Sequence, residues 1–159
     1  MPAFVWRGAA LLAALWAGVL LCIGAIAAPA AFAVLPTADA GRVAGRLFSI
    51  EAHAGLAVAV VLFIVERRRA RDAAEAGQGS VMSANLVILL GVLFCTVAGY
   101  FALQPMMAAA RAGQSAVSFG ALHGVSSVFF VLKGLLVLVL AWRLVGPPPA
   151  AVLRPPRSS

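Results

Sequence analysis

The sequence predicts an all-α, polytopic membrane protein in which four transmembrane helices form an antiparallel bundle. Of its 159 residues, 64% are hydrophobic and 11% are charged, whereas soluble domains average about 45–50% and about 25%. The mean hydropathy is +1.05. The apolar residues fall into four runs, each close to the roughly 20 residues that a helix needs to cross a bilayer. Lipid forces backbone hydrogen bonds to close within each crossing segment, so each run should be helical.

The four spans are expected at about residues 8–32, 43–65, 84–103 and 118–145. The first run is longer than the apolar region of a signal peptide, so we expect a span. The second begins with a polar third and ends in a purely aliphatic stretch. Together the spans make a transmembrane domain over residues 1–145. Residues 146–159 are proline-rich and should form a disordered cytoplasmic tail.

Basic residues predict the orientation. With four spans, both termini and the loop after the second span share one side, which holds eight arginines against three on the other. The eight are Arg7, Arg67, Arg68, Arg69, Arg71, Arg143, Arg154 and Arg157, and the three are Arg42, Arg46 and Arg111. Because basic residues gather in cytoplasmic loops, we expect a multi-pass membrane protein with both termini in the cytoplasm. The net charge of +7 then reflects topology, and the expected partner is the lipid bilayer rather than nucleic acid.

Small residues recur at intervals of four in three of the spans, where they would let a neighbouring backbone approach. The three stripes are Gly91, Cys95 and Gly99, then Ala14, Gly18 and Cys22, and finally Gly41, Gly45 and Ser49. We expect ordinary packing within the bundle, while a dimer face, and with it a homo-oligomer, stays open. Cys22 and Cys95 both lie in apolar runs and should be free, buried thiols.

Polar side chains inside the spans mark a candidate interior polar site, because such residues are rare in lipid and often functional. The candidates are Glu51, His53, His123, Ser126, Ser127 and Lys133. Four of them, from His123 to Lys133, lie on the fourth span within about a third of the helix circumference. A polar stripe this narrow should face the other helices.

Lys133 and Glu51 are expected at different depths. Lys133 lies near the bilayer centre, where a charged lysine costs about 2.5–3.5 kcal/mol on insertion scales, and Glu51 lies in the outer part of the second span. We therefore favour a Lys133 that snorkels toward the inner interface, with a pathway for an ion or anion as the alternative. Glu51 should pair with Arg46 or Arg111 at the outer mouth, and a proton or cation role stays open.

His53 and His123 should both lie in the outer half of the membrane. We favour helix-to-helix hydrogen bonding for them and expect no cofactor. The alternative is a copper or haem site, in which Met106 and Met107 would add soft thioether ligands. The sequence has no GxSxG, HExxH or phosphate-loop pattern, so we expect a protein that is not an enzyme.

Three segments carry a family resemblance. They are AGRVAGRLF at the entry to the second span, FCTVAGYFALQPMM in the third, and FxxLHxxS at the entry to the fourth, here Phe119, Leu122, His123 and Ser126. These segments are similar to the bacterial transmembrane protein 205-like family, known as domain of unknown function 4149, over about residues 6–142. The resemblance implies a four-helix membrane bundle and no particular reaction, and with it we expect a protein of the bacterial inner membrane. Family members often carry an amide a turn or two after the histidine, where this chain has Phe129 and Phe130.

Three function classes follow. The first is a small transport or resistance-associated component, which the link of eukaryotic relatives with drug and metal-compound resistance favours. The second is a copper- or haem-binding protein, and the third is a non-catalytic scaffold or partner subunit. Transport predicts a cavity that reaches Lys133, and metal binding predicts that His53 and His123 lie within a few ångströms. A scaffold predicts a dry interior with both histidines bonded to neighbouring helices.

Overall fold

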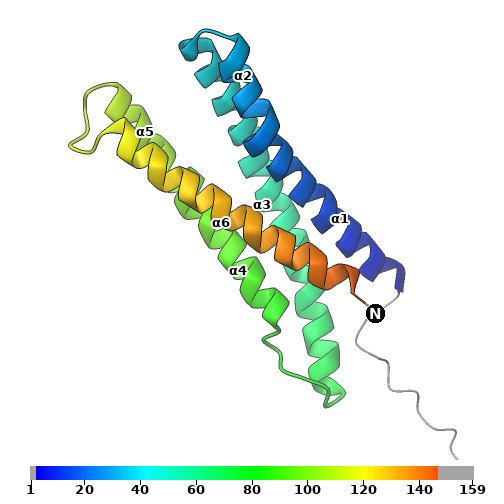
Figure 1. Cartoon of the computed structure of the whole chain (residues 1–159). Helices are drawn as coiled ribbons and strands as arrows, with labels where there is room; N and C mark the ends of the chain where they lie inside the picture. The colour runs from blue at the N-terminus through cyan, green and yellow to red at the C-terminus, as the bar shows by residue number, and fades with distance from the viewer. Residues whose placement is uncertain (1–2, 147–159) are drawn as a thin grey trace, which may run out of the picture.

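The computed structural model describes residues 3–146, and all regular secondary structure within them is helical (Figure 1). Four helices are long and apolar enough to cross a membrane, at Phe4–Val34, Thr37–Glu75, Ala84–Arg111 and Phe119–Val145. The predicted fold class, an all-α membrane bundle, is confirmed. The predicted tail lies outside the described residues from residue 147 onward.

The spans are built as follows. The first consists of α1 (Ala3–Cys22), a π-helical segment η1 (Ile23–Ala27) and α2 (Ala28–Val34), and the second is the continuous helix α3 (Thr37–Glu75). The third consists of α4 (Ala84–Thr96), a π-helical segment η2 (Val97–Ala102) and α5 (Leu103–Arg111), and the fourth is α6 (Phe119–Val145). Helix α3 has 39 residues, which extend about 58 Å at about 1.5 Å per residue. It therefore far exceeds a hydrocarbon core of about 30 Å.

Both π-helical segments lie just before a proline. Pro29 and Pro105 lack an N–H group, and each ring would clash with the carbonyl four residues earlier in a regular helix. Those carbonyls belong to Ala25 and Phe101, which lie inside η1 and η2. A wider turn at these positions relieves the clash and lets each helix continue through the proline.

The two ends of the bundle differ. The described chain ends and the connection between α3 and α4 lie at one end, here called the terminal end, and the α2–α3 and α5–α6 connections lie at the other, the hairpin end (Figure 1). At the terminal end α6 packs against α1 and α4, and α3 packs against both of those helices. At the hairpin end the α2–α3 and α5–α6 hairpins diverge (Figure 1). The helices are thus packed together at the terminal end and spread apart at the hairpin end.

The hydrophobic core lies in the terminal half and draws on all four spans. Its buried members are Ala9, Ala10, Ala13, Trp16, Ala17, Leu20, Ala59, Leu62, Leu89, Val92, Val137, Leu140, Ala141 and Leu144. Many of the α1 members are alanines, which let α6 approach α1 closely along this half of the bundle. This packing closes the terminal end.

The small-residue stripe of the third span packs as expected. A Cβ on Gly99 would overlap the Cβ of Phe129, and a Cβ on Gly91 would lie 3.2 Å from Leu136 Cδ1. Both contacts join the third span to α6. The interior-packing prediction is wrong for the other two stripes, because a Cβ at Gly18 or at Gly41 and Gly45 would meet nothing within 4 Å.

The two cysteines are free, but only Cys95 is buried. Cys22 is exposed, which corrects the prediction of two buried thiols. The face of α1 that enters the core carries Ala13, Trp16 and Leu20. Cys22 lies off that face, beside the exposed Leu21.

Candidate functional site

Glu51 and Lys133 meet inside the bundle. Lys133 Nζ donates a hydrogen bond to Glu51 Oε2 at 2.5 Å, and the two side chains are 4% and 2% exposed, respectively. Trp16 Nε1 donates to the other carboxylate oxygen, Oε1, at 3.1 Å. The site therefore joins α1, α3 and α6 through one carboxylate, with a partner for each of its oxygens.

This pair corrects two expectations. The prediction that no acid lies at the depth of Lys133 is wrong, and Glu51 pairs with Lys133 rather than with Arg46 or Arg111. The error came from the start of the second span, because α3 begins at Thr37 and not near residue 43. Glu51 follows the first residue of α3 by fourteen positions, and Lys133 follows the first residue of α6 by the same fourteen. Each lies about 21 Å along its helix from the hairpin end.

Aromatic rings pack beside the ammonium group. Lys133 Nζ lies 5.2 Å from the ring centroid of Phe130, within the range of a cation–π contact. Phe130 in turn packs edge-on against Phe48, with the ring centroids 4.9 Å apart. A Cβ on Gly24 would lie 2.9 Å from Phe130 Cε1, so the glycine of η1 is what admits this ring. The ion pair is thus flanked by aromatic side chains.

The pair lines a cavity of about 440 Å³ in the hairpin half of the bundle, here called the groove. Side chains from all four spans line it, and most of the lining is apolar. Its polar lining residues are Glu51, Thr96, Tyr100, Gln104, Arg111, His123, Ser126, Ser127 and Lys133. Both π-helical segments contribute, through Gly24 and Ala25 of η1 and through Gly99 and Tyr100 of η2. A π-helical turn inside an α-helix is frequent at functional sites.

A cation lies where α5 ends and α6 begins. Arg111 Cζ is 4.4 Å from the ring centroid of Phe119, and that ring stacks on His123 with centroids 5.6 Å apart and planes 13° apart. Arg111 and His123 both line the groove. Among the ion pairs formed within residues 3–146, none includes Arg111.

The two serines of the predicted polar stripe also reach the groove. Ser126 Oγ donates to the backbone oxygen of Gly99 at 2.6 Å. This bond joins α6 to η2 at the point where Gly99 allows the closest approach. Ser127 Oγ donates to the backbone oxygen of His123 in its own helix at 2.9 Å. Ser126 therefore joins two helices, whereas the hydroxyl of Ser127 bonds within its own helix.

The histidines and methionines lie in different surroundings. His53 is exposed, its Nδ1 is 2.7 Å from the backbone oxygen of Ser49, and its ring packs edge-on against Phe101 at 5.1 Å. His53 is not among the groove-lining residues, whereas His123 and Met107 are. Met106 is 45% exposed. The described part of the chain contains no cluster of three or more His, Cys, Asp or Glu side chains placed to hold a metal ion.

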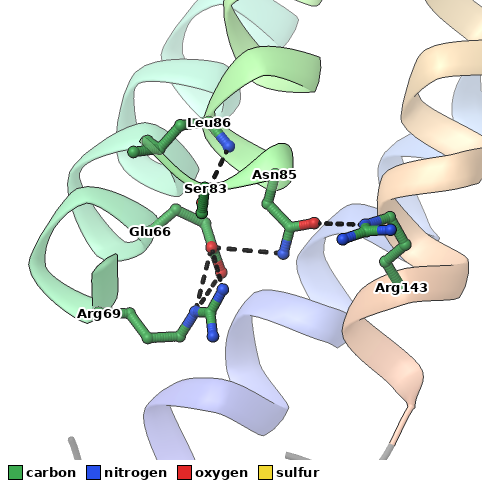
Figure 2. Close-up of polar contacts among 6 residues, drawn as sticks. All are labelled: Glu66, Arg69, Ser83, Asn85, Leu86 and Arg143. Atoms are coloured by element: carbon green, nitrogen blue, oxygen red, sulfur yellow. Dashed lines mark hydrogen bonds and ion pairs between the residues drawn. The ribbon is translucent and has the colours of Figure 1, made fainter. Parts of the chain in front are cut away.

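The sequence reasoning missed a second buried acid, Glu66, which is 1% exposed. Arg69 donates to Glu66 Oε2 from Nη2 at 3.0 Å and from Nε at 3.1 Å. Asn85 Nδ2 donates to the same oxygen at 3.3 Å, and Arg143 Nε donates to Asn85 Oδ1 at 2.7 Å (Figure 2). This chain of contacts ties α3, α4 and α6 together at the terminal end.

Local structure positions this network. Ser83 caps α4 by accepting a hydrogen bond from Leu86 N at 3.3 Å (Figure 2), which fixes the first turn that carries Asn85. The guanidinium of Arg69 lies 5.1 Å from the ring centroid of Trp6, so α1 joins as well. The sequence feature that could have indicated this network was Asn85 itself, a polar amide in the first turn of an apolar span.

Residues 11–116, more than half of the chain, match the family model described as Domain of unknown function (DUF4149). The chain belongs to this family. The matched region of this DUF4149 protein contains Glu51, Glu66 and Asn85, whereas Lys133 and Arg143 lie beyond it in α6. The match confirms the predicted domain of unknown function and does not test the likeness to transmembrane protein 205. No curated protein and no solved structure matches the chain.

Proposed function

We propose that this DUF4149 protein is a small transport component of the bacterial inner membrane, not an enzyme, and that the groove binds its solute. The observation that carries the proposal is a cavity in the hairpin half whose lining includes both members of a buried ion pair, Glu51 and Lys133. A cavity that reaches Lys133 is what transport requires. A scaffold whose polar groups are all structural requires no such cavity.

The energetics of the pair favour a working role over a structural one. Desolvation of two charges offsets much of their attraction, so a buried ion pair is often no more stabilising than apolar residues of the same volume. Ionisable groups within membrane spans commonly mark substrate or ion pathways. Packing alone therefore gives little reason to place Glu51 and Lys133 in the bundle interior.

The position of the pair suggests how binding acts on the bundle. Glu51 belongs to the α2–α3 hairpin and Lys133 to the α5–α6 hairpin, and these hairpins diverge at the hairpin end (Figure 1). A solute that fills the groove beside the pair lies between the two hairpins and weakens the contact between them. Loss of that contact lets the hairpins move relative to each other, while the Glu66 network holds the terminal end together.

The arginine distribution supports cytoplasmic termini, which would turn the groove toward the extracytoplasmic side. The core closes the terminal half, so passage through the protein requires a conformational change or a second copy of the chain. This scheme needs no cofactor. The partners it requires are the bilayer, the solute and, where a second copy completes the path, another protomer.

Thiol accessibility tests the proposal. Ser127→Cys, in a background with Cys22→Ser and Cys95→Ser, places a thiol on the groove lining. Val128→Cys is the matched control, because Val128 is the next residue along α6, its side chain is 67% exposed, and it lies outside the groove lining. A membrane-impermeant methanethiosulfonate reagent needs a thiolate, which forms in water and not in lipid.

We expect the reagent to label Ser127→Cys from the extracytoplasmic side of spheroplasts and to leave Val128→Cys unlabelled. Inverted vesicles should also label Ser127→Cys, more slowly, because a transporter exposes its site to each side in turn. Labelling from one side alone would contradict transport. No labelling from either side would exclude a water-accessible groove.

A further inference from the structure

We infer that the solute is a single-chain amphiphile with an anionic head group, and that Arg111 binds the head group at the mouth of the groove. The inference rests on the proposed function, because it names the class of solute for the same site. Charge, position and apolar lining each support it.

The groove carries an excess of positive charge. Its lining holds two basic side chains, Lys133 and Arg111, and one acid, Glu51. Lys133 is neutralised by Glu51, so Arg111 supplies the surplus, next to the imidazole of His123 on the shared Phe119 ring. A guanidinium presents several donors in a planar fork that fits a carboxylate or phosphate. The ligand that would pair with Arg111 is therefore an anion.

The position of Arg111 fits a head group rather than a buried ion. Arg111 is the last residue of α5 and lies beside the first residue of α6, at the hairpin end. The ion pair at Lys133 lies about 21 Å further along α6. The charged contact thus lies near the membrane surface with apolar lining beneath it, which is the polarity of an amphiphile in one leaflet.

The apolar lining offers a path for one chain. Four apolar lining residues keep a large part of their surface uncovered by the rest of the chain: Leu21, Val131, Leu135 and Leu138, with exposures of 52%, 59%, 55% and 38%. A chain could therefore enter from the lipid without leaving an apolar environment. The volume of about 440 Å³ lies within the range of about 300–1,000 Å³ that holds one small ligand, so we commit to one chain rather than two.

Quenching of Trp16 provides the test. The chain has three tryptophans, Trp6, Trp16 and Trp142, and the indole of Trp16 bonds to Glu51 at the groove. A Trp6→Phe/Trp142→Phe variant in phosphatidylcholine nanodiscs leaves Trp16 as the sole reporter. The probes are dibromostearate, the dibrominated alcohol of the same chain length and a dibrominated alkyltrimethylammonium. We expect saturable quenching by dibromostearate at about tenfold lower concentration than by the alcohol, which corresponds to about 1.4 kcal/mol.

Arg111→Gln should remove the preference for dibromostearate over the alcohol. Arg46→Gln is the matched control, because Arg46 is an exposed arginine of the hairpin half that does not line the groove, and it should keep the preference. Equal quenching by all three probes, a preference for the ammonium, or a preference that survives Arg111→Gln would overturn the inference and leave a ligand-binding groove. A stronger preference for brominated phosphatidylglycerol would overturn the single-chain assignment. Absence of saturable quenching by every probe would overturn the proposed function as well.

Discussion

Removing Lys133 alone should destabilise the protein more than removing both members of its ion pair. Lys133→Met leaves the carboxylate of Glu51 uncompensated in a site where it is 2% exposed, and breaking a buried pair in this way costs about 3–5 kcal/mol. In Glu51→Gln/Lys133→Met no buried charge remains, and the Gln oxygen can still accept the hydrogen bond from Trp16. Replacement of a whole buried pair is often close to neutral, so the double variant should lie within about 1–2 kcal/mol of the parent protein.

The assay is reversible unfolding by SDS in bicelles, followed by far-UV circular dichroism. The four proteins of the cycle give a coupling energy, which should be at least about 2 kcal/mol if the two groups act as a pair. Arg46→Met is the control for loss of a basic residue at an exposed position, and it should change the unfolding free energy by less than about 0.5 kcal/mol. Additive costs for the two single variants would refute the reasoning, because they would show that Glu51 and Lys133 do not interact.

Three further predictions concern packing, the second network and orientation. Gly99→Ala should lower the unfolding free energy by about 1–3 kcal/mol in the same assay, because the added Cβ would overlap Phe129 and the helices must separate. Gly45→Ala is the control, because nothing lies within 4 Å of its Cβ position, and it should be neutral or slightly stabilising. Equal costs for the two variants would contradict the close contact at Gly99. Asn85→Leu should cost about 1–3 kcal/mol by leaving buried polar partners unsatisfied, so an unchanged unfolding free energy would show that the Glu66 network does not hold the terminal end. A fluorescent reporter fused to the C-terminus should fluoresce and alkaline phosphatase inserted after Gly113 should be active, and the reverse pattern would invert the topology.

The number and type of the helices followed from composition because lipid leaves a crossing segment few alternatives to the helix. The depth of the polar groups did not follow as easily. The polar start of the second span led us to place its beginning near residue 43, whereas the helix begins at Thr37. That shift is large enough to hide the register between Glu51 and Lys133. Polar residues at a span entry thus reveal little about where the helix itself begins.

The helix faces were harder to predict than the helices. Stripes of small residues occur on three spans, but only the one with Gly91 and Gly99 meets another helix. Intervals of four show which residues share a face, and they do not show which face has a neighbour. The pairing of Asn85 with Glu66 and Arg143 depends on the packing of three helices, which one sequence does not contain.

The length of α3 has a mechanical consequence for the ion pair. A helix of 39 residues cannot fit within the hydrocarbon, and the stretch that must emerge on the terminal side carries three exposed arginines, Arg67, Arg68 and Arg71. Basic side chains at that level are attracted to anionic lipid head groups. We therefore expect them to resist movement of α3 along the membrane normal, which would hold Glu51 at a fixed depth. In a thinner or thicker bilayer we expect the shorter spans to change their tilt relative to α3. The groove would then widen or narrow at the hairpin end, while the Glu51–Lys133 pair stayed at the same depth.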